Sequence, residues 1–260
     1  MTIKITGTGS ALPPMVRTNA DLEAMVETSD AWISERTGIK ERRIADPDTN
    51  VLTSLAAQAS MEALKSAGKN AEDVDLIIVS TCSEEELFPC AACQVQKMIG
   101  ATKAVCYDLN AACSGFLFAL SNAYAYIHSG MYKNALVIGS EVLSKLVDWT
   151  DRGTCVLFGD GAGAVYVEAV EENDGLLSVV CGSTGALGDV LKCETRGGYI
   201  LMDGKPVYKF ATRQVPMCIE EAVEKAGLTV QDIDVFILHQ ANIRILEAVA
   251  KRLDVSMDKV

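Results

Sequence analysis

Histidine is scarce in this chain of 260 residues, which contains only His128 and His239. Any acid–base step that needs an imidazole must therefore use one of these two positions. A basic surplus is absent as well, because 35 acidic residues outnumber 23 basic ones and give a formal net charge of −12. This balance argues against general nucleic-acid binding, although it is compatible with a local basic patch.

The sequence also lacks a secretory signal-peptide pattern, and its nine cysteines form an odd number. Both features favour reduced thiols in the cytoplasm over a disulfide framework. Cys90 and Cys93 stand in a C-x-x-C spacing, which is compatible with redox chemistry or with zinc. No second cysteine pair or nearby histidine completes a zinc ligand set, so we predict a packing role for the pair and no metal site.

Charged side chains are missing from Leu109 to Met131, a run long enough to suggest a membrane span. The run nevertheless contains polar residues such as Asn110, Ser121, Asn122 and His128. This composition favours a helix buried in a large core, and we predict no membrane interaction.

The segment around Cys113 has the features of a reactive thiol. The apolar run 104–109 predicts a short buried strand, and 114–129 predicts a long helix. A thiol between them lies near a helix N-terminus, where free backbone N–H groups and the helix dipole favour the thiolate. A buried, inert cysteine fits the local pattern equally well.

Apolar strands and amphipathic helices alternate along the chain. The predicted helices include 54–67, 89–99, 209–226 and 242–253, and the predicted strands include 76–81, 134–139 and 235–238. This alternation predicts an α/β fold with buried sheets.

A shorter helix is predicted from Asp30 to Arg36, with Ser29 or Asp30 as its cap. Trp32 and Arg36 are four residues apart and therefore share one face of that helix. Such a pair can stack a nucleotide base and contact a phosphate. The alternative is that Trp32 belongs to the core and Arg36 is solvated.

The sequence contains an internal repeat at a constant offset of 159 residues. Residues 62–68 match 221–227, and residues 73–80 match 232–239 without a gap. A helix end, a glycine, an Asp-x-Asp turn and an apolar run recur in register. We therefore predict a duplicated α/β unit, with a surface crossing between the copies at the polar residues 171–174.

The repeat predicts an N-terminal half over residues 1–170, which carries Cys113, and a C-terminal half over 171–260. The second half has no counterpart of residues 102 onward, so we predict that it is incomplete. Cys113 and His239 each follow a predicted strand at comparable points of the two copies. Because sites in α/β sheets gather at the carboxyl ends of strands, we predict a Cys–His catalytic pair and a structural role for His128.

Four segments carry a resemblance to a known family, namely Asp30–Ile39, Asp108–Phe116, Phe158–Ala164 and His239–Asn242. The chain resembles β-ketoacyl-acyl carrier protein synthase III over its whole length. That resemblance implies a thiolase-like fold of duplicated half-domains, with mixed sheets and buried central helices in α-β-α-β-α layers.

The resemblance further implies a decarboxylative Claisen condensation that initiates fatty acid synthesis. Cys113 would take an acyl group from acyl-CoA, with acetyl-CoA as the expected starter. Malonyl-acyl carrier protein would then lose CO2, and its carbanion would attack the thioester. His239 would donate a hydrogen bond to the enolate oxygen, and the Cys113 N–H would form part of an oxyanion hole. Acyl-CoA is a substrate in this scheme, and no tightly bound cofactor is implied.

Several positions match residues that the family uses to bind CoA or to assemble. The CoA-binding matches are Trp32, Arg36, Arg152, Met202, Gly204, Tyr208, Ala241 and Asn242. Trp32 and Arg152 would sandwich the adenine, and Arg36 would contact a phosphate. Phe88 would close the acyl pocket of the neighbouring subunit in a homodimer.

The carrier protein of this pathway is acidic, so a partner with a charge of −12 needs a positive docking surface. The candidates are Lys209, Arg213, Arg244, Lys251 and Arg252. Arg244 and Lys251 are two helical turns apart and share one face. Ordinary solvated charge is the alternative explanation.

The sequence departs from the family pattern at one point. The family's catalytic asparagine, in a Gly-Asn-Thr-Ser segment, and a glycine loop of the oxyanion hole would lie beyond Val260. The repeat and the resemblance thus both predict a missing C-terminal portion, whose loss would affect decarboxylation most. Three alternatives stay open: a relative that transfers acyl groups to a hydroxyl, a condensing enzyme of secondary metabolism, and an inactive CoA-binding fragment.

Overall fold

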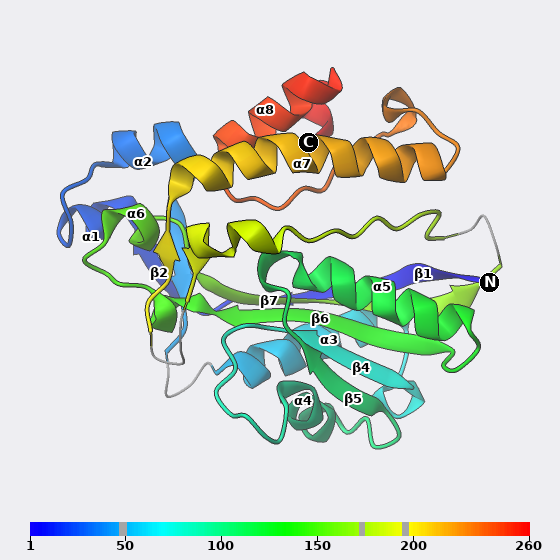
Figure 1. Ribbon diagram of the computed structural model, residues 1–260. Helices are drawn as coiled ribbons and strands as arrows, with labels where there is room; N and C mark the ends of the chain where they lie inside the picture. The colour runs from blue at the N-terminus through cyan, green and yellow to red at the C-terminus, as the bar shows by residue number, and fades with distance from the viewer. Residues whose placement is uncertain (47–50, 172–174, 194–197) are drawn as a thin grey trace. The chain divides into compact units, whose positions relative to one another are not determined.

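A computed structural model describes residues 1–46, 51–171, 175–193 and 198–260 (Figure 1). The chain forms two compact units, and each is assembled from three segments. The first unit contains Met1–Val16, Arg43–Ser144 and Gly159–Leu177, and the second contains Arg17–Arg42, Lys145–Phe158 and Ser178–Val260. Residues 172–174 of the predicted crossing lie outside the described residues. The predicted division of the chain at 170/171 stays a prediction.

The first unit is built on a five-stranded mixed sheet with the strand order β1-β7-β6-β4-β5. Its strands are β1 (Thr2–Ala11), β4 (Leu76–Ser80), β5 (Val105–Leu109), β6 (Asn134–Val142) and β7 (Asp160–Val170). β4 pairs in parallel with β5 and β6, whereas β7 is antiparallel to β6 and β1. The carboxyl ends of β4, β5 and β6 therefore meet at one edge, where functional residues gather in α/β proteins.

Helices cover both faces of this sheet. α3 (Leu52–Ala67) and α4 (Ala91–Ile99) lie on one face, and α5 (Gly115–His128) lies on the other (Figure 1). Each face of the sheet has its own hydrophobic core, and strand β4 contributes side chains to both. Ile77 and Val79 pack toward α3, whereas Leu76 and Ile78 pack toward α5. This arrangement confirms the prediction of a strand buried on both faces.

Close packing of α3 on β1 depends on glycine. A Cβ atom on Gly9 would overlap the carbonyl oxygen of Ala59, and one on Gly7 would overlap that of Ala63. Only glycine lets the helix backbone approach the strand so closely.

α5 confirms the prediction that the uncharged run forms a buried helix. It has 14 residues, and its Ala119, Ala123 and Ile127 are fully buried. Among the described residues, no helix combines the length and the apolar character that a bilayer crossing requires.

The second unit is mainly helical. Its elements are α1 (Asn19–Glu23), α2 (Asp30–Thr37), α6 (Arg152–Cys155), β8 (Leu191–Lys192), β9 (Leu201–Met202), α7 (Gly204–Lys225) and α8 (Ile243–Leu253). Two further strands, β2 (Met15–Thr18) and β3 (Glu41–Ile44), pair with each other, and each has residues in both units. Its core places Phe236, Ile245 and Val249 against α7.

The internal repeat is visible in local structure. α3 ends at Gly68 with φ 66°, and the corresponding Gly227 follows α7 with φ 73°. Each glycine precedes a short 3-10 helix, Ala71–Asp73 in the first copy and Val230–Asp232 in the second. These equivalent turns keep the offset found in the sequence.

The two copies diverge at the strand that was predicted to follow. Residues 235–238 form no strand in the described structure, so that prediction is wrong. Phe236 is buried, but Ile237 is 95% exposed. β4 has a neighbouring strand on each side, whereas the Phe236 N–H donates to the Lys259 carbonyl at 2.7 Å. An apolar run becomes a strand only where a neighbouring strand forms hydrogen bonds with its backbone N–H and C=O groups. Tertiary context therefore decides whether residues 235–238 form a strand.

Candidate active site

The cysteine predicted as the nucleophile lies on a sharp turn between β5 and α5. The 3-10 helix Ala112–Ser114 connects the two elements, and Cys113 is exposed at its centre. Ala112 has φ 45°, a left-handed conformation that is uncommon for alanine and typical of strained functional turns. The predicted strand–turn–helix context of Cys113 is thus confirmed. The prediction that the strand is buried is wrong, because β5 lies at the edge of the sheet and its residues are half-buried or exposed.

The nucleophile turn rests on the end of β4. A Cβ atom on Gly115 would overlap the Ser80 hydroxyl oxygen, so the first residue of α5 must be small. One residue further along, the Thr81 N–H donates to the Leu109 carbonyl at 3.1 Å. The turn is therefore held between the carboxyl ends of two parallel strands.

The ionisation of Cys113 differs from the prediction. Withdrawal of the thiol from water raises its pKa, although the residue as a whole is exposed. The Glu141 carboxylate raises the pKa further, and a hydrogen bond from the Cys113 backbone opposes both effects. The expectation that the helix start favours the thiolate is thus wrong, because desolvation and a negative neighbour outweigh it. The resting nucleophile is a thiol that needs a base.

Glu141, near the end of β6, is a residue that sequence reasoning missed. Its carboxylate accepts hydrogen bonds from the residues that follow β4. The available signal was a lone acidic residue at the end of the otherwise uncharged run 134–142. That position places it at the same sheet edge as Cys113.

The C-x-x-C pair lies at the start of α4. Burial raises the pKa of Cys90, and it raises the pKa of Cys106 to about 12. Asp108 caps this helix by accepting the N–H groups of Ala91 at 2.7 Å and Ala92 at 2.8 Å. Over the described parts of the chain, no three His, Cys, Asp or Glu side chains are grouped so that they could hold a metal ion.

In the second unit, three of the predicted CoA-binding residues come together. The guanidinium carbons of Arg36 and Arg152 lie 4.6 Å and 4.8 Å from the centre of the Trp32 ring. Arg152 also donates from Nη1 to the Glu27 carbonyl at 2.9 Å. Trp32 and Arg36 are both half-buried. The alternative, in which Trp32 belongs to the core and Arg36 is solvated, therefore does not describe the pair. Stacked cations on an indole form a surface suited to a base and a phosphate.

His239 also belongs to the second unit. Desolvation lowers its pKa, so the ring is neutral at neutral pH and can donate one hydrogen bond. Its carbonyl accepts the Ala241 N–H at 2.9 Å, and Asn242 caps α8 by accepting the Ile245 N–H at 2.9 Å. The pairing of His239 with Cys113 stays a prediction.

His128 is engaged structurally in the first unit. Its Nδ1 is 2.6 Å from the Met1 carbonyl oxygen, and its ring packs beside Tyr124 with a centroid distance of 5.3 Å. These contacts agree with the structural role predicted for it.

The remaining CoA positions lie around the start of α7. Met202 is in β9, Gly204 begins α7, and Tyr208 follows one turn later and is 40% exposed. A tunnel lined by these residues stays a prediction.

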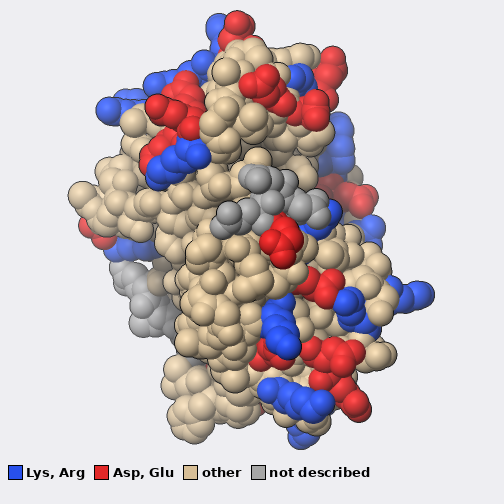
Figure 2. Space-filling view, turned by 90° about the vertical axis from the view of Figure 1, so that its right-hand side faces the viewer, with Lys and Arg blue, Asp and Glu red and all other residues tan. Residues whose placement is uncertain are grey.

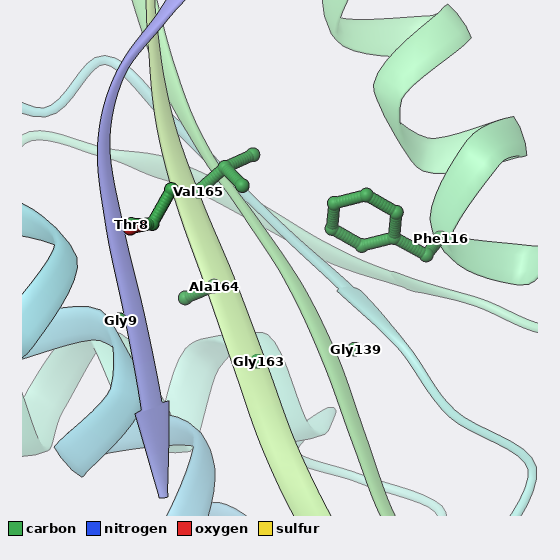
Figure 3. A pocket seen from close by; sticks show the side chains of 7 residues that line it. All are labelled: Thr8, Gly9, Phe116, Gly139, Gly163, Ala164 and Val165. Carbon is green, nitrogen blue, oxygen red and sulfur yellow. The ribbon is translucent and has the colours of Figure 1, made fainter. Parts of the chain in front are cut away.

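A hollow of about 410 Å³ lies elsewhere, on the α5 face of the first unit's sheet (Figure 3). It is lined by Thr8, Gly9, Phe116, Gly139, Gly163, Ala164 and Val165. None of these residues belongs to the predicted site. Phe116 projects toward strands that carry glycines at this point, so no side chains from Gly139 and Gly163 fill the space (Figure 3). The hollow is therefore lined mainly by apolar groups.

The candidate docking residues are all exposed in the second unit. Lys209 and Arg213 are on α7, and Arg244, Lys251 and Arg252 are on α8. Arg244 forms an ion pair with Glu35 at 3.2 Å, an exposed contact of small energetic value. Elsewhere, the face in Figure 2 has acidic and basic side chains interspersed.

The fold and the cysteine turn place this chain among the thiolase-like condensing enzymes. A family model described as 3-oxoacyl-[acyl-carrier-protein (ACP)] synthase III matches residues 107–185, and its C-terminal model matches 223–260. The chain is 47% identical to β-ketoacyl-[acyl-carrier-protein] synthase III of Clostridium acetobutylicum, over 99% of this chain and 82% of that protein. It is 48% identical to β-ketoacyl-[acyl-carrier-protein] synthase III 1 of Bacillus cereus, over 100% of this chain and 83% of that protein.

A solved structure gives the same result. The crystal structure of 3-oxoacyl-[acyl-carrier-protein] synthase III from Aquifex aeolicus matches with a TM-score of 0.96 and 46% identity, over 99% of this chain and 83% of that chain. The chain therefore belongs to the β-ketoacyl-[acyl-carrier-protein] synthase III family, and the predicted thiolase-like α/β fold is confirmed. The matches cover 82% to 83% of each of these relatives, and they do not show that the uncovered residues lie at the C-terminal end. The predicted truncation is therefore not supported.

Proposed function

We propose that this protein condenses an acyl-CoA starter with malonyl-acyl carrier protein and so initiates fatty acid synthesis. The observation that carries the proposal is the thiol of Cys113, which is exposed on a strained turn at the carboxyl end of β5. A family relationship at 47% identity over 99% of the chain supports the reaction class. The same-family alternatives, transfer to a hydroxyl and secondary metabolism, are not favoured by any feature of the described site.

The reaction begins with acyl transfer. The Cys113 sulfur attacks the thioester carbonyl of acyl-CoA, its proton passes through a base to the departing CoA sulfur, and an acyl-Cys thioester forms. The Cys113 N–H stabilises the negative oxygen of the tetrahedral intermediate. Because the pKa of the thiol is raised, a base is needed at neutral pH.

Condensation follows when malonyl-acyl carrier protein loses CO2. Neutral His239 donates a hydrogen bond to the enolate oxygen, and the enolate carbon attacks the acyl thioester and releases the Cys113 sulfur. The lowered pKa of His239 fits this role, because the ring stays neutral and keeps one N–H donor.

CoA binding is assigned to the second unit. Trp32 and Arg36 provide a stacking surface and a phosphate contact, and Met202, Gly204, Tyr208, Ala241 and Asn242 line the path of the pantetheine. Arg152 already covers the indole at 4.8 Å, so an adenine between them requires Arg152 to leave the Glu27 carbonyl. Acyl-CoA acts as a substrate, and we assign no tightly bound cofactor.

The proposed partners follow from charge and exposure. The acidic carrier protein docks on the basic residues of α7 and α8, and a homodimer covers Phe88, which is 83% exposed. None of the nine cysteines is in a disulfide, which fits a cytoplasmic location. Residues 1–170 and 171–260 are the two thiolase-like halves of this proposal.

Release of CO2 from malonyl-acyl carrier protein in the presence of acetyl-CoA tests the proposed reaction. We expect His239→Ala to lose CO2 release by about 100-fold, because the hydrogen bond to the enolate oxygen is lost. Cys113→Ala should lose acetyl loading altogether. His128→Ala is the matched control and should behave as wild type. Unchanged CO2 release in His239→Ala would contradict the role given to this imidazole.

A further inference from the structure

Glu141 binds three consecutive residues at the site edge of the first unit. Its Oε1 accepts the Cys82 N–H at 2.8 Å, and its Oε2 accepts the Thr81 hydroxyl at 3.2 Å. Oε2 also accepts the Ser83 hydroxyl in a short hydrogen bond. Burial raises the pKa of Glu141, whereas these hydrogen bonds lower it, because every partner donates to the carboxylate.

The segment that Glu141 binds is a buried turn with its own hydrogen bonds. The Ser83 hydroxyl accepts the Val142 N–H at 2.9 Å, and the Ser83 N–H donates to the Thr81 hydroxyl at 3.2 Å. Thr81 and Ser83 are each only 3% exposed. The end of β6 and the residues after β4 are thereby locked together.

The same turn supports the nucleophile. The Thr81 N–H donates to the carbonyl of Leu109 at 3.1 Å. Leu109 is the last residue of β5 before the cysteine turn. Gly115, at the start of α5, packs directly on Ser80. A displacement of Thr81–Ser83 would therefore move the Leu109 end of the turn that carries Cys113, and the other end packs on the preceding residue, Ser80.

We propose that Glu141 is a positioning residue for the Cys113 nucleophile, acting through the Thr81–Ser83 turn. The inference rests on the proposed function, in which Cys113 carries the acyl group. The negative charge of Glu141 also acts on the nucleophile and on the turn, because it raises the pKa values of both Cys113 and Cys82. Glu84 is the other acidic group that acts on Cys82 from this turn.

Two readouts on the full-length protein separate positioning from general structure. One is the rate of acetyl transfer from acetyl-CoA to Cys113, and the other is the pH midpoint of Cys113 alkylation by iodoacetamide, located by peptide mass spectrometry. We expect Glu141→Gln to slow acetyl transfer about tenfold or more at a nearly unchanged KM. The alkylation midpoint should shift to lower pH, because a negative neighbour is lost.

Three variants complete the test. Glu141→Asp keeps the charge and should recover part of the transfer rate. Ser83→Ala removes one donor and leaves the charge, so it should slow transfer without lowering the alkylation midpoint. Glu62→Gln is the matched control in the same unit, because the Glu62 carboxylate accepts the Ser10 N–H at 3.1 Å on β1, away from the Thr81–Ser83 turn. This variant should match wild type in both readouts.

Acetyl transfer at the wild-type rate in Glu141→Gln would overturn the inference. So would slower transfer with an unmoved alkylation midpoint, since that result would indicate a general structural defect. If wild-type protein takes no acetyl group at all, the proposed function fails, and the alkylation midpoints then decide the role of Glu141 by themselves.

Discussion

At the scale of single residues, thiol chemistry in this protein is governed by desolvation. Burial raises the pKa of Cys82 and of Cys106 to about 12, and it also raises that of Cys113. A cysteine at the start of a helix is not thereby a thiolate. The feature that distinguishes Cys113 from these half-buried cysteines is its exposure on the turn.

The raised pKa of Cys82 predicts a loss of stability at alkaline pH. Below the pKa of the unfolded chain, about 8.5, the thiol is protonated in both states and contributes no pH dependence. Between that value and the folded value of about 12, only the unfolded chain releases the proton, so rising pH favours unfolding. At pH 10 the full difference between these pKa values corresponds to about 2 kcal/mol. Because the Cys82 side chain is partly exposed, solvent screening reduces this value, and we expect urea unfolding to show about 1 kcal/mol less stability from this group near pH 10 than near pH 7.

Cys82→Ser isolates this effect, because serine does not ionise in this range. Its loss of stability between the two pH values should be about 1 kcal/mol smaller than that of wild type. Cys218→Ser, at an exposed cysteine, serves as the control. An identical alkaline loss in Cys82→Ser and wild type would show that Cys82 does not stay protonated in the folded protein.

The pKa of Cys113 also shows what a sequence does not reveal about a site. Its strand–turn–helix context was predictable, because the apolar run and the small residues are local. The direction of its pKa shift was not, because Glu141 lies 28 residues further along the chain and is turned toward the site by Thr81–Ser83. The pKa of a side chain depends on the groups that surround it in three dimensions, and a local sequence pattern does not identify those groups.

At the scale of elements, prediction succeeded where an element's pattern and its environment agree. β4 and β6 were predicted from apolar runs and are strands with neighbours on both sides. Residues 235–238 have the same pattern but form no strand, because no described strand pairs with them. The duplicated helix end and 3-10 turn persist in both copies, since an αL glycine and a short turn are specified locally.

Helix α8 offers a test of a residue with two assigned roles. Asn242 caps α8 through the Ile245 N–H, and it is also a proposed pantetheine contact. We expect Asn242→Ala to lower the free energy of unfolding by about 1 kcal/mol, whereas Asn242→Ser should keep nearly all of it. Urea unfolding monitored by circular dichroism measures both.

The KM for acetyl-CoA separates the second role of Asn242 from the first. A raised KM in the stable Asn242→Ser variant would support the contact with the substrate. Wild-type stability in Asn242→Ala would contradict the capping role.

At the scale of the whole molecule, the proposed chemistry is divided between two compact units. The thiol and the Glu141 network belong to the first unit, whereas His239 and the Trp32 stack belong to the second. The family resemblance proposes Cys113, His239 and Trp32 from short, specific motifs, whereas Glu141 was identified only in the structure. Chemistry in solution tests their proposed joint action.

Acetyl transfer to a single cysteine tests the central claim most directly. Wild-type protein is incubated with acetyl-CoA, digested and mapped by mass spectrometry, with Cys113→Ala and Cys218→Ala in parallel. The account predicts one acetyl group on the Cys113 peptide in wild type and in Cys218→Ala, and none anywhere in Cys113→Ala. An acetyl group on another cysteine, or a folded wild-type protein that takes none, would contradict it.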